Sequence, residues 1–137
     1  MVSAGGVGIG ADRFGIFAAM VTPFNADGSI DLVRAVAHGR AVLARGAQGL
    51  TLFGTTGEGA SIGTAERGAL IAALLGAGVV PEQLTVTVCA SALPDALAQA
   101  REAFGFGVRK LLLVPPYYFK GVSEAALEGW FAAFLQG

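Results

Sequence analysis

A chain of 137 residues has the length of about one domain, and its 54% hydrophobic residues suffice for a buried core. Charged residues make up only 14%, and the net charge of −1 comes without a basic stripe, which argues against a nucleic-acid partner. The single cysteine, Cys89, excludes an internal disulfide and fits a reducing compartment. Because no apolar run approaches the ~20 residues of a membrane span, we expect no membrane association and a cytoplasmic location.

Strand-like and helix-like segments alternate four times along the chain. The first 13 residues are rich in glycine and alanine and predict a flexible tail. Short apolar runs then predict strands at residues 16–21, 50–53, 84–89 and 111–114. Apolar residues at helical spacing follow each strand. Turn and cap residues bound these helices: Gly46 ends the first, Thr64 caps the second, Pro94 opens the third and Ser123 caps the fourth.

This alternation predicts an α/β fold with a parallel sheet. Repeated βα units of about 30 residues build either a doubly wound sheet or a (β/α)8 barrel. A complete barrel takes ~250 residues, so four units would form half of one. The order of the strands distinguishes the two folds, because a doubly wound sheet reverses its order and a barrel does not.

Two motifs follow predicted strands and are therefore expected at the same end of the sheet. The first is GTTGE at residues 54–58, where glycines let the backbone approach a ligand and hydroxyl and N–H groups could hold a carboxylate or phosphate. The second is VPPYY at residues 114–118, where a tyrosine hydroxyl could relay a proton. Taken alone, the first could also be a simple strand-to-helix turn, and the tyrosines could serve packing or an interface.

Four stretches together resemble the N-terminal half of a known enzyme family. They are residues 21–31 (VTPFNADGSID), 54–58, 66–67 and 114–118. In this order and spacing they are similar to the dihydrodipicolinate synthase and N-acetylneuraminate lyase family of class I, Schiff-base-forming aldolases. The resemblance implies a (β/α)8 barrel of which residues 14–137 form the first four units. It also implies oligomers and a reaction of pyruvate or another 2-keto acid with an aldehyde such as aspartate semialdehyde. We expect no cofactor, and no cluster of His, Cys and carboxylate side chains in the sequence suggests a metal site.

The resemblance also implies roles for individual residues. Thr55 and Tyr118 correspond to a catalytic proton relay, in which Tyr118 reaches into the site of a neighbouring subunit. Thr56 corresponds to the residue that holds the carboxylate of the keto acid, with Gly54 and Gly57 beside it in the substrate-binding loop.

The reaction of this family needs a lysine that the resemblance does not supply here. Lys110 lies at the wrong end of the predicted sheet and Lys120 in an exposed loop, so neither is expected to form the Schiff base. We therefore expect this chain alone to be inactive. Four strands would also leave two open sheet edges, so we expect no stable monomer without a second copy, a second half or the rest of a longer chain.

Three alternatives stay open at this point. The chain could be a non-catalytic assembly module, an aldolase or dehydratase of sugar acids from the same family, or an unrelated doubly wound binding domain. One departure from the family bears on its ligands: the third strand ends in Cys89-Ala90-Ser91, where the family carries a glycine-rich turn.

Overall fold

The computed structural model describes residues 15–137, so the tail expected at residues 1–13 lies outside the described residues. Strands and helices alternate along them. In chain order the elements are β1 (Phe17–Ala19), α1 (Leu32–Ala44), β2 (Gly49–Leu52), η1 (Gly59–Ser61), α2 (Thr64–Gly76), η2 (Pro81–Gln83), β3 (Leu84–Val88), α3 (Leu93–Gly105), β4 (Lys110–Leu113) and α4 (Glu124–Gln136). None of the helices in this part of the chain is both long and apolar enough to cross a bilayer.

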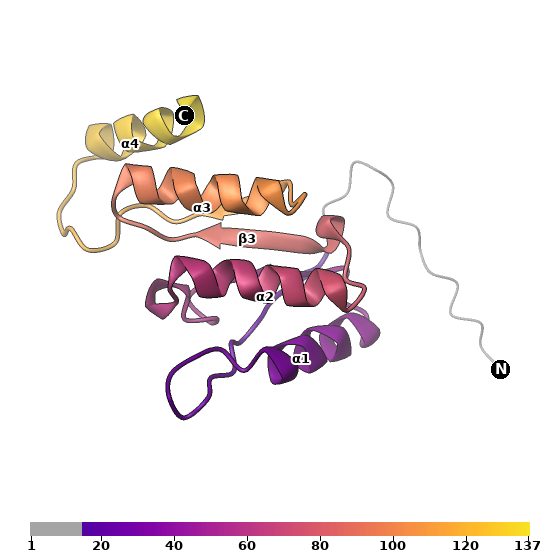
Figure 1. Ribbon diagram of the computed structural model, residues 1–137. Helices are drawn as coiled ribbons and strands as arrows, with labels where there is room; N and C mark the ends of the chain where they lie inside the picture. The colour runs from indigo at the N-terminus through magenta and orange to yellow at the C-terminus, as the bar shows by residue number, and fades with distance from the viewer. Residues whose placement is uncertain (1–14) are drawn as a thin grey trace.

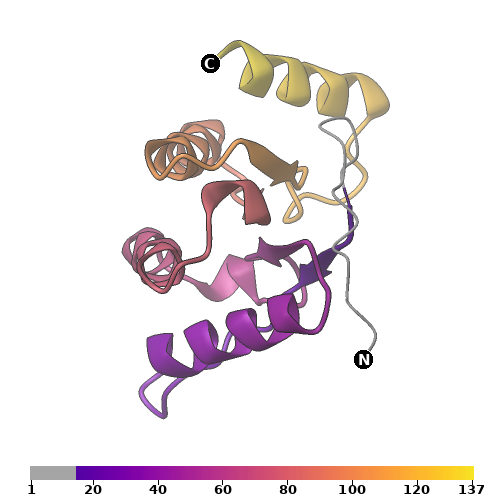
Figure 2. The ribbon, with the colours of Figure 1, turned by 90° about the vertical axis from the view of Figure 1, so that its right-hand side faces the viewer.

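The sheet has the strand order β1-β2-β3-β4, and every neighbouring pair is parallel. The helices follow one another in the same order, from α1 at the bottom of Figure 1 to α4 at the top. Figure 2 shows α2 and α3 end-on, with the strands all to one side of them. A sequential order with helices on one face is the geometry of a barrel and not of a doubly wound sheet, so the predicted half barrel is confirmed.

The core lies between the sheet and its helices. Every second strand residue faces this layer, because side chains alternate between the two faces of a strand. The buried residues that meet there include Leu50, Leu52, Leu84, Val86, Leu70, Ile71 and Leu74. Gly39 lets α1 approach closely, since a Cβ at this position would lie 2.9 Å from a methyl group of Leu50.

The opposite face of the sheet is the face that would line the inside of a barrel. The register places Thr51, Thr85 and Lys110 side by side on it. Thr85 and Thr87 are buried, whereas Leu112 near the open edge is 49% exposed. This face is rich in threonine and is largely not covered by helices. Half of a closed barrel would have such a face, because it would line the inside of the complete barrel.

The first strand is shorter than the predicted 16–21. It lies at an edge with β2 as its single neighbour in the sheet. After Ala19 the pairing continues only through the Met20 N–H, which donates to the Thr51 carbonyl over 3.0 Å. The chain then turns away into a small hairpin closed by the bridge between Phe24 and Ile30.

Several other predicted boundaries are wrong by one residue, whereas the predicted cap Ser123 of α4 is confirmed, since its hydroxyl accepts the Ala126 N–H over 3.3 Å. Phe53 is not part of the second strand because its φ is 62°, in the left-handed region. Cys89 leaves the third strand because its N–H donates to the Gln99 side chain over 2.9 Å. Gly63, in extended conformation, is the N-cap of α2, and the predicted cap Thr64 is the first helical residue.

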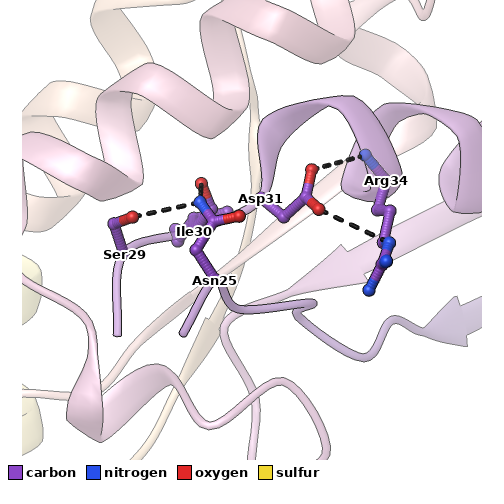
Figure 3. A network of polar contacts seen from close by, with 5 residues as sticks. All are labelled: Asn25, Ser29, Ile30, Asp31 and Arg34. Carbon is purple, nitrogen blue, oxygen red and sulfur yellow. Dashed lines mark hydrogen bonds and ion pairs between the residues drawn. The ribbon is translucent and has the colours of Figure 1, made fainter. Parts of the chain in front are cut away.

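The hairpin ahead of α1 is held by its own side chains, as Figure 3 shows. The Asn25 amide donates to the Ser29 hydroxyl over 3.1 Å and to the Ile30 carbonyl over 3.4 Å. Asp31 caps α1 by accepting the Arg34 N–H over 3.0 Å, and its second oxygen lies 3.5 Å from Arg34 Nε. These short-range bonds fix the shape of the hairpin and the start of α1.

Candidate functional site

The loop after β2 is a tight, internally bonded turn. The N–H groups of Gly57 and Gly59 donate to the Gly54 carbonyl over 3.1 and 3.2 Å, and the Glu58 N–H donates to the Thr55 carbonyl. Within residues 15–137, the N–H groups of Thr55 and Thr56 make no such bond. The Gly54 N–H makes none either, so these three N–H groups of the loop are the ones left available for the anion binding that the sequence suggested.

Close packing fixes the position of this loop. A Cβ on Gly59 would lie 1.8 Å from the Phe53 carbonyl oxygen, and a Cβ on Gly57 would lie 2.8 Å from that of Met20. The buried Thr22 hydroxyl donates to the Gly57 carbonyl over 2.7 Å. Gly57 and Thr22 thus hold the loop against the segment after β1, and Gly59 packs on the end of β2. The contact to Thr22 gives the VTPFN motif a structural purpose.

Glu66 ties the hairpin to α2. Its carboxylate accepts the Ile30 N–H over 3.3 Å and the Gly63 N–H over 3.4 Å. Glu58, in contrast, does not anchor the loop through its side chain. It is exposed, and its bonds in the described chain are made by its backbone at a φ of 53°.

A cavity of about 280 Å³ opens at the carboxyl end of the sheet. Its walls come from the loop after β2, the 3-10 turn η1, the ends of β3 and β4, and the first tyrosine after β4. The lining residues are Phe53, Gly54, Thr55, Glu58, Gly59, Ala60, Ser61, Thr87, Cys89, Val114 and Tyr117. The two motifs after β2 and β4 therefore contribute to one cavity.

The residues expected at the site are distributed unevenly around this cavity. Gly54 and Thr55 line it, whereas Thr56, Gly57 and Tyr118 do not. Tyr118 is 76% exposed and stacks edge-on against Phe119 at 5.5 Å between ring centroids. Its place on the surface is compatible with a role in a neighbouring subunit, and the roles of all five residues stay predictions.

Arg67 is a buried residue of the site region to which the sequence reasoning assigned no role. Its side chain is 0% exposed, and its guanidinium lies 4.2 Å from the centroid of the Phe53 ring. It donates to the Thr87 carbonyl and, over 3.5 Å, to the Cys89 sulfur. One cation from α2 thus supports Phe53 and the end of β3, two parts of the cavity wall. A charged residue inside an apolar helix stripe was the signal that could have revealed it.

Burial shifts the pKa values of Arg67 and of Glu102, which lies near it. It lowers the pKa of Arg67, and the nearby Cys89 and Glu102 oppose that effect. Burial raises the pKa of Glu102, and the positive charge of Arg67 works in the opposite direction. Gly68 permits this approach of α2 and α3, since a Cβ there would lie 2.6 Å from a Glu102 oxygen.

Neither lysine of the chain lines the cavity. Lys110 begins β4 at the opposite end of the sheet, where it donates to the Glu82 carbonyl and lies 4.7 Å from the Phe17 ring centroid. Lys120 donates to the Tyr117 carbonyl over 3.4 Å. In the described part of the chain, no group of three His, Cys, Asp or Glu side chains could hold a metal ion.

Comparison with known proteins places this chain in a family. The profile of the dihydrodipicolinate synthetase family matches residues 12–136. The chain belongs to this family. The resemblance found in the sequence is therefore confirmed, together with the barrel fold that it implied.

Individual members of the dihydrodipicolinate synthetase family support this assignment. The 4-hydroxy-tetrahydrodipicolinate synthase of Synechococcus sp. WH7803 is 36% identical over 88% of this chain and 40% of its own length. The crystal structure of dihydrodipicolinate synthase from Agrobacterium tumefaciens is 43% identical, with a TM-score of 0.86 over 90% of this chain and 43% of that one. YagE from E. coli K12, solved in complex with pyruvate, is 25% identical, with a TM-score of 0.76 over 89% of this chain and 41% of that one.

The chain spans about 40% of the length of these family members. Its described residues form four strands, and a complete (β/α)8 barrel has eight.

Proposed function

We propose that this chain is the N-terminal half of a lyase of the 4-hydroxy-tetrahydrodipicolinate synthase type. The complete polypeptide would condense pyruvate with an aldehyde such as aspartate semialdehyde through a lysine Schiff base. The observation that carries the proposal is the shared cavity built by the GTTGE loop and the VPPYY segment at the carboxyl end of the sheet. The family member solved with pyruvate supports a keto acid as the ligand.

The proposed roles of the site residues follow from their positions. The Thr55 hydroxyl, at the cavity wall, would take part in proton transfer, and the free N–H groups of Thr55 and Thr56 would bind the carboxylate of the keto acid. The exposed Tyr118 would complete the relay in a neighbouring subunit, which requires a homo-oligomer. The Schiff base itself needs a lysine outside this chain.

Trapping of the covalent intermediate tests the proposal. Borohydride reduces a Schiff base to a stable amine, so the complete polypeptide incubated with pyruvate and borohydride should gain the mass of one reduced pyruvate on a lysine. Omission of either reagent is the control. If peptide mapping finds no modified lysine, the Schiff-base mechanism is wrong.

A second proposal concerns this chain in isolation: it does no chemistry and serves only as a part of an assembly. The observation that favours it is that neither Lys110 nor Lys120 lines the cavity. Purified 137-residue chain should therefore turn over no pyruvate with any aldehyde. Turnover that copurifies with this chain and no other polypeptide would contradict the proposal.

A further inference from the structure

The end of β3 carries a buried hydroxyl group in the wall of the cavity. Thr87 is 0% exposed, yet it is one of the residues that line the cavity. Its Oγ1 has no hydrogen-bond partner within residues 15–137. A Cβ placed on Gly54 would lie 3.6 Å from this oxygen, so the hydroxyl points toward the loop after β2.

A buried hydroxyl without a partner is unfavourable, because it has lost its hydrogen bonds to water and gained none from the protein. A valine would fill the same space without this penalty. The backbone carbonyl of Thr87 is already bound to Arg67, so the side-chain hydroxyl is the group of this residue that remains available. Its partner has to come from outside the described chain.

The chain offers a matched comparison two residues earlier. Thr85 lies on the same face of β3, is 5% exposed, and its hydroxyl also lacks a partner within the described residues. Thr85 does not line the cavity. The two threonines thus share residue type, strand, face and burial, and differ in that Thr87 alone is part of the cavity wall.

We propose that Thr87 contacts the substrate: its hydroxyl donates a hydrogen bond to an oxygen atom of the small 2-keto acid bound in the cavity. The inference rests on the proposed function for the identity of the ligand. It adds a polar group on β3 to those of the loop after β2. Because an unpaired hydroxyl disfavours a ligand without a matching acceptor, Thr87 also selects for an oxygen at that position of the substrate.

Substitution of both threonines in the complete polypeptide tests this contact. The readout is the pyruvate concentration that gives half-maximal borohydride trapping. We expect Thr87→Val to raise this concentration about 2- to 10-fold, the effect of one hydrogen bond, with the yield at saturation unchanged. Thr87→Ser keeps the hydroxyl and should stay near the wild-type value, and Thr85→Val should leave the value unchanged.

Two results would overturn the proposal. One is an unchanged half-maximal concentration in Thr87→Val. The other is an equal change in Thr87→Val and Thr85→Val together with equal shifts of their melting temperatures, which would show that both hydroxyls bind protein groups.

Calorimetry with pyruvate separates this inference from the proposed function. If the wild type shows no trapping but binds pyruvate, and Thr87→Val weakens that binding, the Schiff-base mechanism fails while the contact stands. If trapping is normal and Thr87→Val binds as the wild type does, the contact fails while the mechanism stands.

Discussion

At the scale of single residues, Thr55 is the member of the candidate proton relay that lines the cavity. Thr55→Val removes the hydroxyl and keeps the shape. We expect kcat of the complete polypeptide to fall about 100-fold or more, since proton transfer by a positioned group contributes that much. Steady-state assays with pyruvate and the aldehyde provide the measurement.

The matched control is Thr64→Val, which changes an exposed threonine in the first turn of α2 that does not line the cavity. It should keep the wild-type kcat. A Thr55→Val protein with full activity would remove Thr55 from the relay.

Arg67 supports two parts of the cavity wall, so its replacement should destabilise the fold around the cavity. Arg67→Ala removes the contacts to Phe53 and to the Thr87 carbonyl and leaves an empty space in the core. We expect the free energy of unfolding to fall by about 3 kcal/mol. Urea denaturation of the complete polypeptide measures it.

Arg67→Lys should recover less than half of this loss, because an ammonium group cannot stack on the ring and reach two acceptors at once. Full recovery would show that the charge alone matters.

Glu102 links stability to pH in a direction opposite to that of a paired carboxylate. Its pKa is raised above the ordinary 4.5 by burial, so the folded state holds the proton more tightly than the unfolded state does. This contribution to stability is present below pH 4.5 and is lost as the pH rises through the folded-state pKa.

Glu102→Gln should therefore reduce the dependence of the free energy of unfolding on pH just above pH 4.5. It should not destabilise the protein at pH 7. Thermal melts across this range test it. A variant that loses stability at pH 7 would mean that the attraction to Arg67 outweighs the burial of Glu102.

At the scale of elements, the loop after β2 depends on the absence of a side chain at Gly59. A Cβ there would meet the Phe53 carbonyl oxygen at 1.8 Å, and backbone cannot move aside as a flexible side chain can. We expect Gly59→Ala to destabilise the protein by about 2 kcal/mol or more and to weaken keto-acid binding. Thermal melts and pyruvate titration give the two values.

Gly63→Ala is the control, because its Cβ would have only an ordinary contact of 3.6 Å with the Glu66 side chain. Its φ of −66° also suits any residue. If Gly59→Ala melts like Gly63→Ala, the loop is not held by the packing described above.

The elements themselves were predictable from local patterns, and the site was predictable only in part. Apolar runs and helical spacing identify four strands and four helices, because both signals come from residues near in sequence. Contacts between distant residues carry no such local signal. The bond from Thr22 to Gly57, the position of Arg67 below Phe53 and the left-handed turn at Phe53 all arise from tertiary packing. For the same reason the sequence could place Thr55 and Tyr118 at one end of the sheet, but it could not tell that Thr55 lines the cavity and Tyr118 does not.

At the scale of the whole molecule, the open sheet determines how this chain behaves alone. Within residues 15–137 the edge strands β1 and β4 each have one neighbour. Ile16, next to β1, is 73% exposed and Leu112, in β4, is 49% exposed. Exposed edges and apolar side chains favour association. We therefore expect the isolated 137-residue chain to sediment faster as its concentration rises. A concentration-independent monomer with a single cooperative unfolding transition would contradict this expectation.

Trp130, the single tryptophan of the sequence, lies far along the chain from the loop after β2. In α4 its ring stacks on Phe134 at 6.1 Å between centroids, in the cluster that joins α4 to α3 and to the end of β3. The cavity is lined by other residues. Tryptophan fluorescence from this half of the protein would therefore report the docking of the last helix and would not change during ligand titration, so it measures folding alone.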